Sequence, residues 1–327
     1  MEETLGELGE FGLIEAVTAR LPQGPHVLLG PGDDAALLAA PDRRVVASTD
    51  LLVEGRHFRR DWSTGYEIGR KAAAANLADI AAMGARPTAL LIGLAAPATL
   101  PVRWALDLAD GLRDECEPVG ASVIGGDVVG AEAITIAVTA LGDLAGREPV
   151  TRSGARPGDV LALAGRVGWS AAGLALLTLA SGGDLGEVAE SPLIRAHLQP
   201  EPPYDAGPAA AAGGATAMID VSDGLVQDLG HIAAGSGVAI DVDPAALELS
   251  PLLAAAARCG VDPYDWALAG GEDHALAATF PSTAGLPYGW RRIGGVLAGG
   301  GVTVTVAGQP YRRAGGWAHF SGDAPVP

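Results

Sequence analysis

The sequence predicts an α/β (or α+β) protein made of two domains. Its 327 residues are more than one hydrophobic core usually organises, so two domains are the expected arrangement. Apolar runs of strand length alternate with segments of helical periodicity, which is typical of this fold class. A polar break at Gly146–Pro149 separates the two halves, and we therefore predict domains at residues 1–148 and 149–327.

Helical spacing and stop signals predict three helices in the first domain, and apolar runs predict four strands. We expect one strand to end in Ser48-Thr49-Asp50 and another to end in Gly125-Gly126-Asp127. The predicted helices are Phe11–Leu21, Tyr66–Met83 and Pro101–Pro118, and the predicted strands are Arg44–Thr49, Thr88–Ala95, Ser122–Asp127 and Ala133–Leu141.

The second domain is expected to follow the same alternation. A helix is expected to open at Ser222-Asp223-Gly224 and to run to Ala234. The other predicted helix is Ser170–Leu179, and the predicted strands are Val160–Ala164, Ala217–Asp220, Val238–Val242, Ala275–Phe280, Arg292–Leu297 and Val302–Val306.

Composition excludes several classes of function. The formal net charge of −18 argues against binding nucleic acid or an anionic membrane through a basic surface. No apolar run reaches the roughly 18 residues of a membrane span. Cys116 and Cys259 lie far apart without metal-binding spacing, and the N-terminus has no hydrophobic segment, so we expect a reduced, cytoplasmic protein. Aromatic residues are only 5% of the chain, so its core must rest on Ala, Val, Leu and Ile.

Carboxylates recur beside glycines and at the expected ends of apolar strands. A single Asp-Gly pair is usually a turn, but six acidic segments together favour a site for hard cations. Oxygen ligands suit Mg²⁺, which commonly bridges one or two carboxylates to substrate phosphates. Calcium is the competing metal, but the EF-hand loop pattern is absent, as are the Walker A, HExxH and GxSxG motifs. The segments are Gly30–Asp34, Ser48–Asp50, Asp79, Gly125–Asp127, Asp220–Gly224 and Gly270–Asp273.

The Asp220–Gly224 segment has two interpretations. Its spacing places Asp220 at a strand end and Ser222 or Asp223 at a helix N-cap. A helix N-terminus favours phosphate, but two carboxylates there repel phosphate unless a metal lies between them. The segment is therefore either a metal-bridged phosphate site or an ordinary capped helix, and both alternatives stay open on the residues alone.

Taken together, the motifs resemble those of the thiamine-monophosphate kinase family, nearly end to end and in the family's order. Each motif alone is weak, and their combination is specific. They are Gly9–Ile14, Gly32–Ala36, Ser48–Phe58, Asn76–Gly84, Gly125–Asp127, Thr151–Ala155, Ile219–Leu225, Gly270–Asp273 and Gly316–Phe320.

The resemblance implies ATP-dependent conversion of thiamine monophosphate to thiamine diphosphate. It also implies the two-domain fold of aminoimidazole-ribonucleotide synthetase. In that fold the N-terminal domain binds ATP and Mg²⁺ and pairs in a homodimer, its sheets forming a barrel, and a C-terminal α/β domain packs beside it.

The resemblance also assigns roles to individual residues. Several Mg²⁺ ions are expected on Asp34, Ser48, Thr49, Asp50, Asp79, Asp127, Asp220 and Asp223, with Asp33 shaping the turn instead. ATP is expected on Gly126, Asp127, Arg152 and Ser222, and thiamine phosphate on His57, Glu272 and Trp317. The expected catalytic residues are Asp50, Asp127, Arg152 and Asp223. On the residues alone, His57 is equally a loop cap, Trp317 core and Arg152 a surface charge.

Elementary chemistry agrees with this assignment. A phosphate monoester is already mostly dianionic at neutral pH, so its attacking oxygen needs no general base. The barrier is repulsion between two anions, which metal ions and positive charge reduce. Arg152 would add such charge, and Trp317 would stack on a cationic thiazolium ring.

The chain departs from the family pattern at four positions. Trp169 replaces an Asp, Gln199 and Pro203 replace arginines, and His274 replaces an aromatic residue. Related enzymes of the same fold are the first alternatives. Selenophosphate synthetase and the hydrogenase-maturation protein need cysteines that are absent at the matching places, and the segments around His57 disfavour aminoimidazole-ribonucleotide synthetase. A non-catalytic Mg²⁺-nucleotide-binding protein is the alternative from another class.

Overall fold

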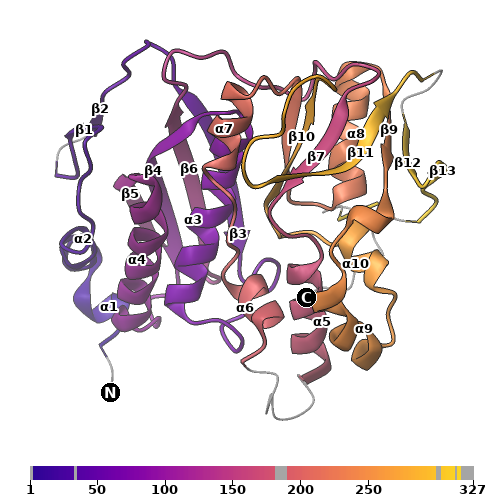
Figure 1. Cartoon of the computed structure of the whole chain (residues 1–327). Coiled ribbons are helices and arrows are strands. Elements are labelled where there is room, and N and C mark those ends of the chain that lie inside the picture. The colour runs from indigo at the N-terminus through magenta and orange to yellow at the C-terminus, as the bar shows by residue number, and fades with distance from the viewer. Residues whose placement is uncertain (1–2, 33–34, 181–189, 300–302, 314, 318–327) are drawn as a thin grey trace. The chain divides into compact units, whose positions relative to one another are not determined.

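The structure is a computed structural model that describes residues 3–32, 35–180, 190–299, 303–313 and 315–317 (Figure 1). The chain divides into two compact units. Of the residues described, the N-terminal unit takes those up to Ile80 together with Arg86–Gly146, and the C-terminal unit takes Ala81–Ala85 and those from Arg147 onward. Among the described residues, no helix is long and apolar enough to cross a membrane.

A four-stranded sheet forms the centre of the N-terminal unit. Its strand order is β3-β6-β4-β5, with β4 and β5 parallel and the other pairs antiparallel. The strands are β3 (Val46–Val53), β4 (Arg86–Ala96), β5 (Ser122–Gly130) and β6 (Thr135–Asp143), and a separate pair joins β1 (Val27–Leu29) to β2 (Leu37–Leu38).

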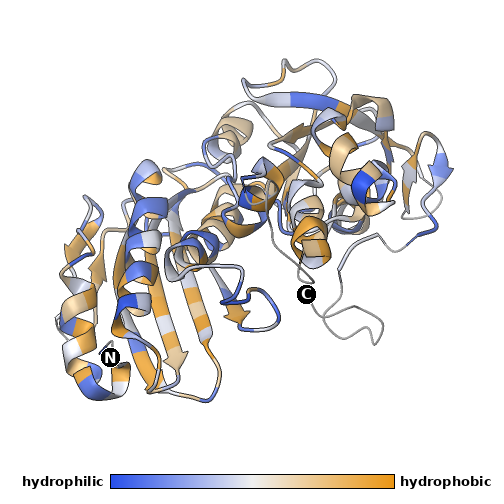
Figure 2. Cartoon of the chain, turned by 90° about the horizontal axis from the view of Figure 1, so that it is seen from below, coloured by the Kyte–Doolittle hydropathy of each residue, from blue (hydrophilic) through white to orange (hydrophobic). Residues whose placement is uncertain are grey.

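Helices cover one face of this sheet. Figure 1 shows α3 (Gly65–Ala82) and α4 (Val102–Cys116) lying over the strands, with α1 (Leu5–Leu8) and α2 (Glu10–Thr18) beside them. The face they cover is apolar, since Ile136, Val138 and Ala140 of β6 are fully buried. Residues between them are half-exposed, as the period of two in a strand requires. Figure 2 shows these strands coloured mainly as hydrophobic.

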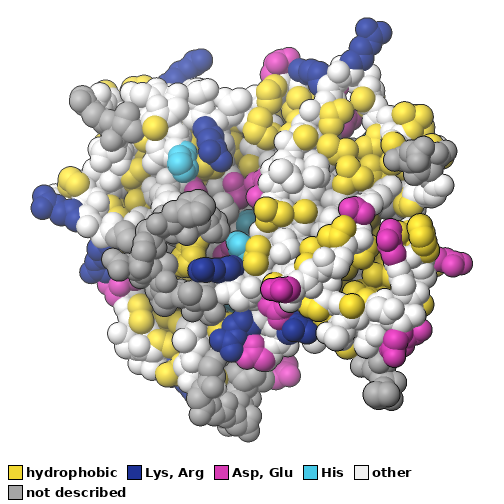
Figure 3. Space-filling view, turned by 180° about the vertical axis from the view of Figure 1, so that it is seen from behind, with side chains coloured by type: hydrophobic (Ala, Val, Ile, Leu, Met, Phe, Trp, Pro, Cys, Tyr) yellow, Lys and Arg dark blue, Asp and Glu magenta, His cyan; other side chains and the backbone are white. Residues whose placement is uncertain are grey.

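The opposite face of the sheet, which we call the open face, also carries apolar side chains. Leu51, Leu91 and Val129 are 58%, 37% and 51% exposed. The view from behind in Figure 3 shows hydrophobic side chains gathered on this side of the N-terminal unit. Contiguous exposed apolar surface commonly marks an interaction site.

A seven-stranded sheet forms the centre of the C-terminal unit. Its order is β13-β12-β9-β11-β7-β10-β8, and all neighbours are antiparallel except β9 and β12. The strands are β7 (Val160–Ala164), β8 (Ala217–Val221), β9 (Ala239–Val242), β10 (Ala275–Phe280), β11 (Trp290–Leu297), β12 (Thr303–Val306) and β13 (Gln309–Pro310). The helices are α5 (Trp169–Ala180), α6 (Pro192–Leu198), α7 (Ala206–Ala212), α8 (Leu225–Ser236), α9 (Leu253–Cys259) and α10 (Pro263–Ala269).

One buried cluster in the core of this unit is rich in alanine. Alanines from β7, β10 and α7 meet in it, in line with the low aromatic content. Its two aromatic residues, Phe280 and Trp290, pack edge to face with ring centroids 5.4 Å apart. The Trp290 indole donates a hydrogen bond to the carbonyl of Ala206, which satisfies its buried N–H.

Most predicted elements are present, but two predicted strand ends are wrong. Strand β3 does not stop at Asp50, because Leu51–Val53 continue the ladder with β6. Strand β5 likewise runs through Asp127 to Gly130, paired with β4. These carboxylates therefore lie inside strands rather than on turns. The predicted Val302 lies outside the described residues, and β12 is described from Thr303.

Candidate functional site

In the N-terminal unit, three predicted ligands share one face of the sheet. Side chains alternate along β3, so Ser48 and Asp50 project to the same side. The Ser48 hydroxyl donates a hydrogen bond of 2.6 Å to the Asp79 carboxylate on α3, which identifies this side as the helix-covered one. Ser48 and Asp79 are therefore in contact and Asp50 lies on the same face of the sheet, whereas Asp33 and Asp34 lie outside the described residues.

Two other predicted metal ligands lie on the open face. Thr49 alternates with Ser48, and its hydroxyl donates to the carbonyl of Val138 at 2.9 Å. The register across the sheet places Asp127 in one row with Gly93, Ala137 and Leu51, which is the open-face set. The structure thus separates the side chains of Thr49 and Asp127 from the group around Asp79.

Two further predicted binding residues of this unit have structural roles. A Cβ at Gly126 would lie 1.9 Å from the carbonyl oxygen of Ile92, so the packing of β5 on β4 itself requires glycine there. The Nδ1 atom of His57 accepts a hydrogen bond of 3.0 Å from the backbone N–H of Val53. His57 therefore caps the turn after β3, one of the two roles that its sequence context allowed.

In the C-terminal unit, we call the Val221–Gly224 segment the β8–α8 loop. Its backbone is held by Asp228, an acidic residue that the sequence analysis did not single out. Helix α8 begins at Leu225 with Gly224 as its N-cap, and no side chain caps it from the N-cap position. Asp228 Oδ2 instead accepts hydrogen bonds from the backbone N–H groups of Asp223 at 3.1 Å and Gly224 at 3.0 Å. The expectation that Ser222 or Asp223 caps the helix is therefore wrong.

Three aspartates lie close together at this loop. Asp228 and Asp220 are almost fully buried. Burial is the main cause that raises the pKa of Asp228 to about 7, and the negative charges of Asp220 and Asp223 raise it further. The two backbone N–H donors partly oppose this rise in pKa. Burial and the two neighbouring negative charges therefore act in the same direction on Asp228.

Two distant segments of the chain bind the carbonyl groups of this loop. The carbonyls of Val221, the last residue of β8, and of Ser222 and Asp223 all accept backbone hydrogen bonds. The donors are His274 to Val221 at 3.0 Å, Glu272 to Ser222 at 2.7 Å and Trp317 to Asp223 at 3.0 Å. The structure thereby brings together four residues predicted to bind metal, ATP or substrate: Ser222, Asp223, Glu272 and Trp317.

Glycines permit this close approach. A Cβ at Gly271 would lie 2.5 Å from the carbonyl oxygen of Ser222, and one at Gly316 would lie 2.6 Å from that of Asp223. Glu272 adopts a left-handed backbone with φ of +67°. Such a conformation costs of order 1–3 kcal/mol and is concentrated at functional sites. The side chain of His274 faces Asp220, with 3.6 Å between Nδ1 and Oδ2.

Asp273, the neighbour of Glu272, has a structural role instead. Its carboxylate is 9% exposed and accepts hydrogen bonds from the backbone N–H groups of Gly168 at 2.5 Å and Ser170 at 2.8 Å. It therefore caps the start of α5. Burial raises the pKa of Asp273 to about 7, against the lowering effect of these donors. The Gly168-Trp169-Ser170 segment has no acidic residue to cap α5 itself. This lack is the signal in the sequence that an acid from elsewhere, here Asp273, supplies the cap.

The structure accounts for one departure from the family pattern. The guanidinium of Arg166 lies 4.5 Å from the centroid of the Trp169 ring, and Arg166 also forms an ion pair with Glu201. Trp169 therefore belongs to a local cation–π cluster.

Arg152 is placed apart from the loop. Its side chain is exposed, and its carbonyl accepts a hydrogen bond of 3.1 Å from the hydroxyl of Ser236. Ser236 ends α8, whereas Asp223 precedes the first turn. Helix α8 has 12 residues, so its two ends are about 16 Å apart at the usual rise per residue. The structure does not bring Arg152 and Ser222 together.

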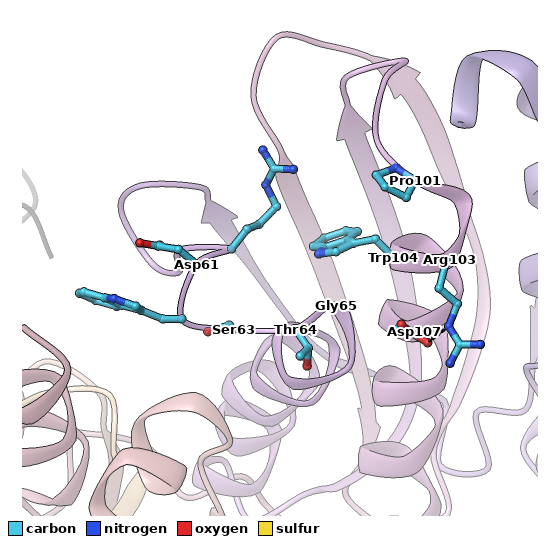
Figure 4. A pocket seen from close by; sticks show the side chains of 10 residues that line it. Asp61, Ser63, Thr64, Gly65, Pro101, Arg103, Trp104 and Asp107 are labelled. Carbon is cyan, nitrogen blue, oxygen red and sulfur yellow. Dashed lines mark ion pairs between the residues drawn. The ribbon is translucent and has the colours of Figure 1, made fainter. Parts of the chain in front are cut away.

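A cleft of about 410 Å³ in the N-terminal unit contains none of the predicted site residues. Figure 4 shows it between the Asp61–Gly65 segment and the first turns of α4, with Trp104 facing that segment. Its two arginines are already paired, Arg103 with Asp107 at 2.8 Å and Arg60 with Glu54 at 2.6 Å. Because a carboxylate already pairs with each guanidinium group, we assign no anion-binding role to the cleft.

The predicted ligands suit magnesium by their chemistry. All are oxygen donors, and Mg²⁺ usually takes one or two carboxylates, retains waters and completes its shell with substrate phosphates. Within the ranges that the structure describes, no group of three or more His, Cys, Asp or Glu side chains is arranged to hold a metal ion by itself. The donors therefore fit an ion that arrives with a nucleotide better than an all-protein cage.

Comparison with known proteins defines the class. Residues 32–144 match the family model described as AIR synthase related protein, N-terminal domain, and residues 156–306 match the corresponding C-terminal domain. The fold, with one N-terminal and one C-terminal domain in the chain, is therefore that of an AIR synthase related protein, as the sequence predicts. The chain is 52% identical over 319 residues to a thiamine-monophosphate kinase from Mycobacterium tuberculosis, covering 97% of this chain and 93% of that protein. It belongs to the thiamine-monophosphate kinase family.

Solved structures agree with this family. A thiamine-monophosphate kinase from Stenotrophomonas maltophilia K279a superposes with a TM-score of 0.79 at 33% identity, covering 91% of this chain and 96% of that one. AaThiL complexed with AMPPCP and TMP superposes with a TM-score of 0.77 at 35% identity, covering 97% and 99%.

The raised pKa of Asp273 predicts how stability changes with pH. Between about pH 4 and pH 7 the folded protein keeps this proton while the unfolded chain releases it, so the free energy of unfolding falls as pH rises through this window. Asp273→Asn removes this contribution, at most about 1.4 kcal/mol per pH unit. Urea unfolding at several pH values from 5 to 8 should give a shallower pH slope for Asp273→Asn than for the wild type.

Asp262→Asn is the matched control for this measurement. Asp262 is an exposed cap, accepting from the N–H of Tyr264 at the start of α10. It should lower stability by a similar amount at every pH and keep the wild-type slope. An unchanged slope in Asp273→Asn would contradict the assigned cause.

Proposed function

We propose that this protein transfers the γ-phosphoryl group of ATP to thiamine monophosphate, giving thiamine diphosphate and ADP. The observation that carries the proposal is the 52% identity to a thiamine-monophosphate kinase over 97% of the chain. The structural relative complexed with AMPPCP and TMP supports both the nucleotide and the acceptor. The reaction forms one P–O bond to the acceptor phosphate and breaks the bond between the β- and γ-phosphates.

The residues of the site serve positioning and charge rather than acid–base chemistry. The attacking oxygen belongs to a phosphate that is mostly dianionic at neutral pH, so no general base is needed. We propose that Ser48, Asp50 and Asp79 in the N-terminal unit hold metal, and that Asp220 and Asp223 do so in the C-terminal unit. When bound, Mg²⁺ would neutralise phosphate charge during transfer. Asp34, Thr49 and Asp127 remain predicted ligands.

The remaining binding roles follow the same division. We propose Ser222 as an ATP contact and Glu272 and Trp317 as thiamine phosphate contacts, because Ser222 lies in the β8–α8 loop and the carbonyls of that loop hold the backbones of Glu272 and Trp317. Gly126 and Arg152 stay predicted ATP contacts, and His57 stays a predicted thiamine phosphate contact. Both cysteines are free thiols, which supports the cytoplasm as the compartment.

The direct test is to incubate the protein with ATP, Mg²⁺ and thiamine monophosphate and to measure thiamine diphosphate by chromatography. Product should form with thiamine monophosphate and not with thiamine, because the acceptor is a phosphate. Omitting Mg²⁺ or adding excess chelator should abolish it. Tight ATP binding without product would favour a non-catalytic nucleotide-binding protein.

Replacing single metal-binding carboxylates should abolish turnover without unfolding the protein. We expect Asp50→Asn and Asp223→Asn each to lower kcat by about 100-fold or more, because the amide loses the charge that holds a metal. Neither side chain is buried, so thermal unfolding should change little. Asp107→Asn, which breaks only a surface pair with Arg103, is the control and should retain wild-type kinetics. Near-normal turnover in either site variant would remove that residue from the metal set.

We also propose that the protein is a homodimer joined through the open face of the N-terminal sheet. Apolar side chains on that face, including Leu51 and Val129, are about half exposed. Pairing two such sheets removes this area from water, as in the barrel that the family fold implies. Residues 1–148 would then supply the dimer interface.

Leu51→Arg tests this interface. Leu51 is 58% exposed within one chain, so the substitution should leave the monomer folded while placing a charge in the interface. By light scattering during size-exclusion chromatography, wild type should have about twice the mass of the 32.8 kDa chain, and Leu51→Arg should have the chain mass. Leu28→Arg, at a 64% exposed position on β1, should remain dimeric. A dimeric Leu51→Arg would place the interface elsewhere.

A further inference from the structure

We infer that Asp228 is a positioning residue, which holds the β8–α8 loop in the conformation that presents Ser222 and Asp223 to nucleotide and metal. The inference rests on the proposed function, which makes those two side chains ligands. Asp228 is only 2% exposed, so its carboxylate does not contact a ligand that arrives from solvent. Its role is to act through the backbone of the loop.

The hydrogen bonds of Asp228 are placed where the loop turns into the helix. A single oxygen, Oδ2, accepts from the N–H groups of Asp223 and Gly224. A buried N–H donor that is left without an acceptor bears the full cost of its lost hydration. Without these hydrogen bonds, two N–H groups at a buried helix start lack an acceptor, and the loop must shift to find one.

A shift of this loop would move substrate-binding residues as well. The carbonyl of Ser222 holds the backbone of Glu272, and that of Asp223 holds the backbone of Trp317. Asp228 therefore positions the proposed nucleotide contact Ser222 through the loop backbone. It positions the proposed thiamine phosphate contacts Glu272 and Trp317 indirectly, through the carbonyls of that loop. Its neighbour Gln227 differs, because its side-chain amide donates to the carbonyl of Trp317 at 2.7 Å.

This difference gives a matched pair of variants. Asp228→Ala removes the acceptor, Asp228→Asn keeps an acceptor oxygen without the charge, and Gln227→Ala releases only the Trp317 segment. Asp241→Ala serves as a stability control, since Asp241 accepts from the N–H of Gly308 at 2.8 Å in the turn between β12 and β13. Each variant is assayed for KM of both substrates, for kcat and for Mg²⁺·AMPPCP binding by calorimetry, with thermal unfolding measured alongside.

Asp228→Ala should weaken Mg²⁺·AMPPCP binding by about tenfold, the order expected when buried N–H donors lose their acceptor, and should raise KM for both substrates. Asp228→Asn should recover binding to within about threefold of wild type. Gln227→Ala should raise KM for thiamine monophosphate and leave nucleotide binding unchanged. Asp241→Ala should change only the unfolding temperature.

Two results would overturn the inference. One is wild-type nucleotide binding by a folded Asp228→Ala. The other is an Asp228→Asn variant as impaired as Asp228→Ala, which would assign the effect to charge and not to position. If Asp228→Ala does not fold, Asp228→Glu replaces it: the charge is kept, the acceptor is displaced by one methylene, and unchanged nucleotide binding would again overturn the inference. A wild type that binds AMPPCP but makes no thiamine diphosphate would refute the proposed function and leave this comparison intact.

Discussion

The candidate site depends on the hydrogen bonding of one short loop. The carbonyls of Val221, Ser222 and Asp223 each accept from another segment of the C-terminal unit, and two N–H groups at the loop's end are taken by Asp228. Buried backbone groups must be paired, so this pairing holds the conformation in place. The same conformation carries the side chains of Ser222 and Asp223, which are predicted to bind nucleotide and metal.

The sequence predicts best the strands that are buried on both faces. Strands β7 and β10 have the predicted bounds, because each is a continuous apolar run that the sheet buries completely or nearly so. The prediction fails where polar residues interrupt a strand. Asp50 and Asp127 suggested turns, yet β6 and β4 supply ladder partners that continue both strands. Local composition carries no information about such partners, which come from distant parts of the chain.

The same limit explains which site residues the sequence reveals. Resemblance names Ser222, Asp223 and Glu272 without geometry, and the structure shows the backbone bonds that bring them together. The resemblance also places Ser48 and Thr49 in one motif, whereas in the structure the pleat of β3 puts their side chains on opposite faces of the sheet. Asp228 was not predicted at all. An acid one turn into a helix is usually solvated, and only tertiary burial turns it into an acceptor for the loop.

Asp228 and Asp273 show how environment separates two similar acids. Both are buried, both accept two backbone N–H groups at a helix start, and burial raises the pKa of each to about 7. Their neighbours differ in sign. His274 and Arg166 favour the ionised form of Asp273, so its surroundings already supply positive charge. Asp220 and Asp223 disfavour the ionised form of Asp228, and an added positive charge beside them would favour it. The first acid thus has positive neighbours at its helix start, and the second has negative ones.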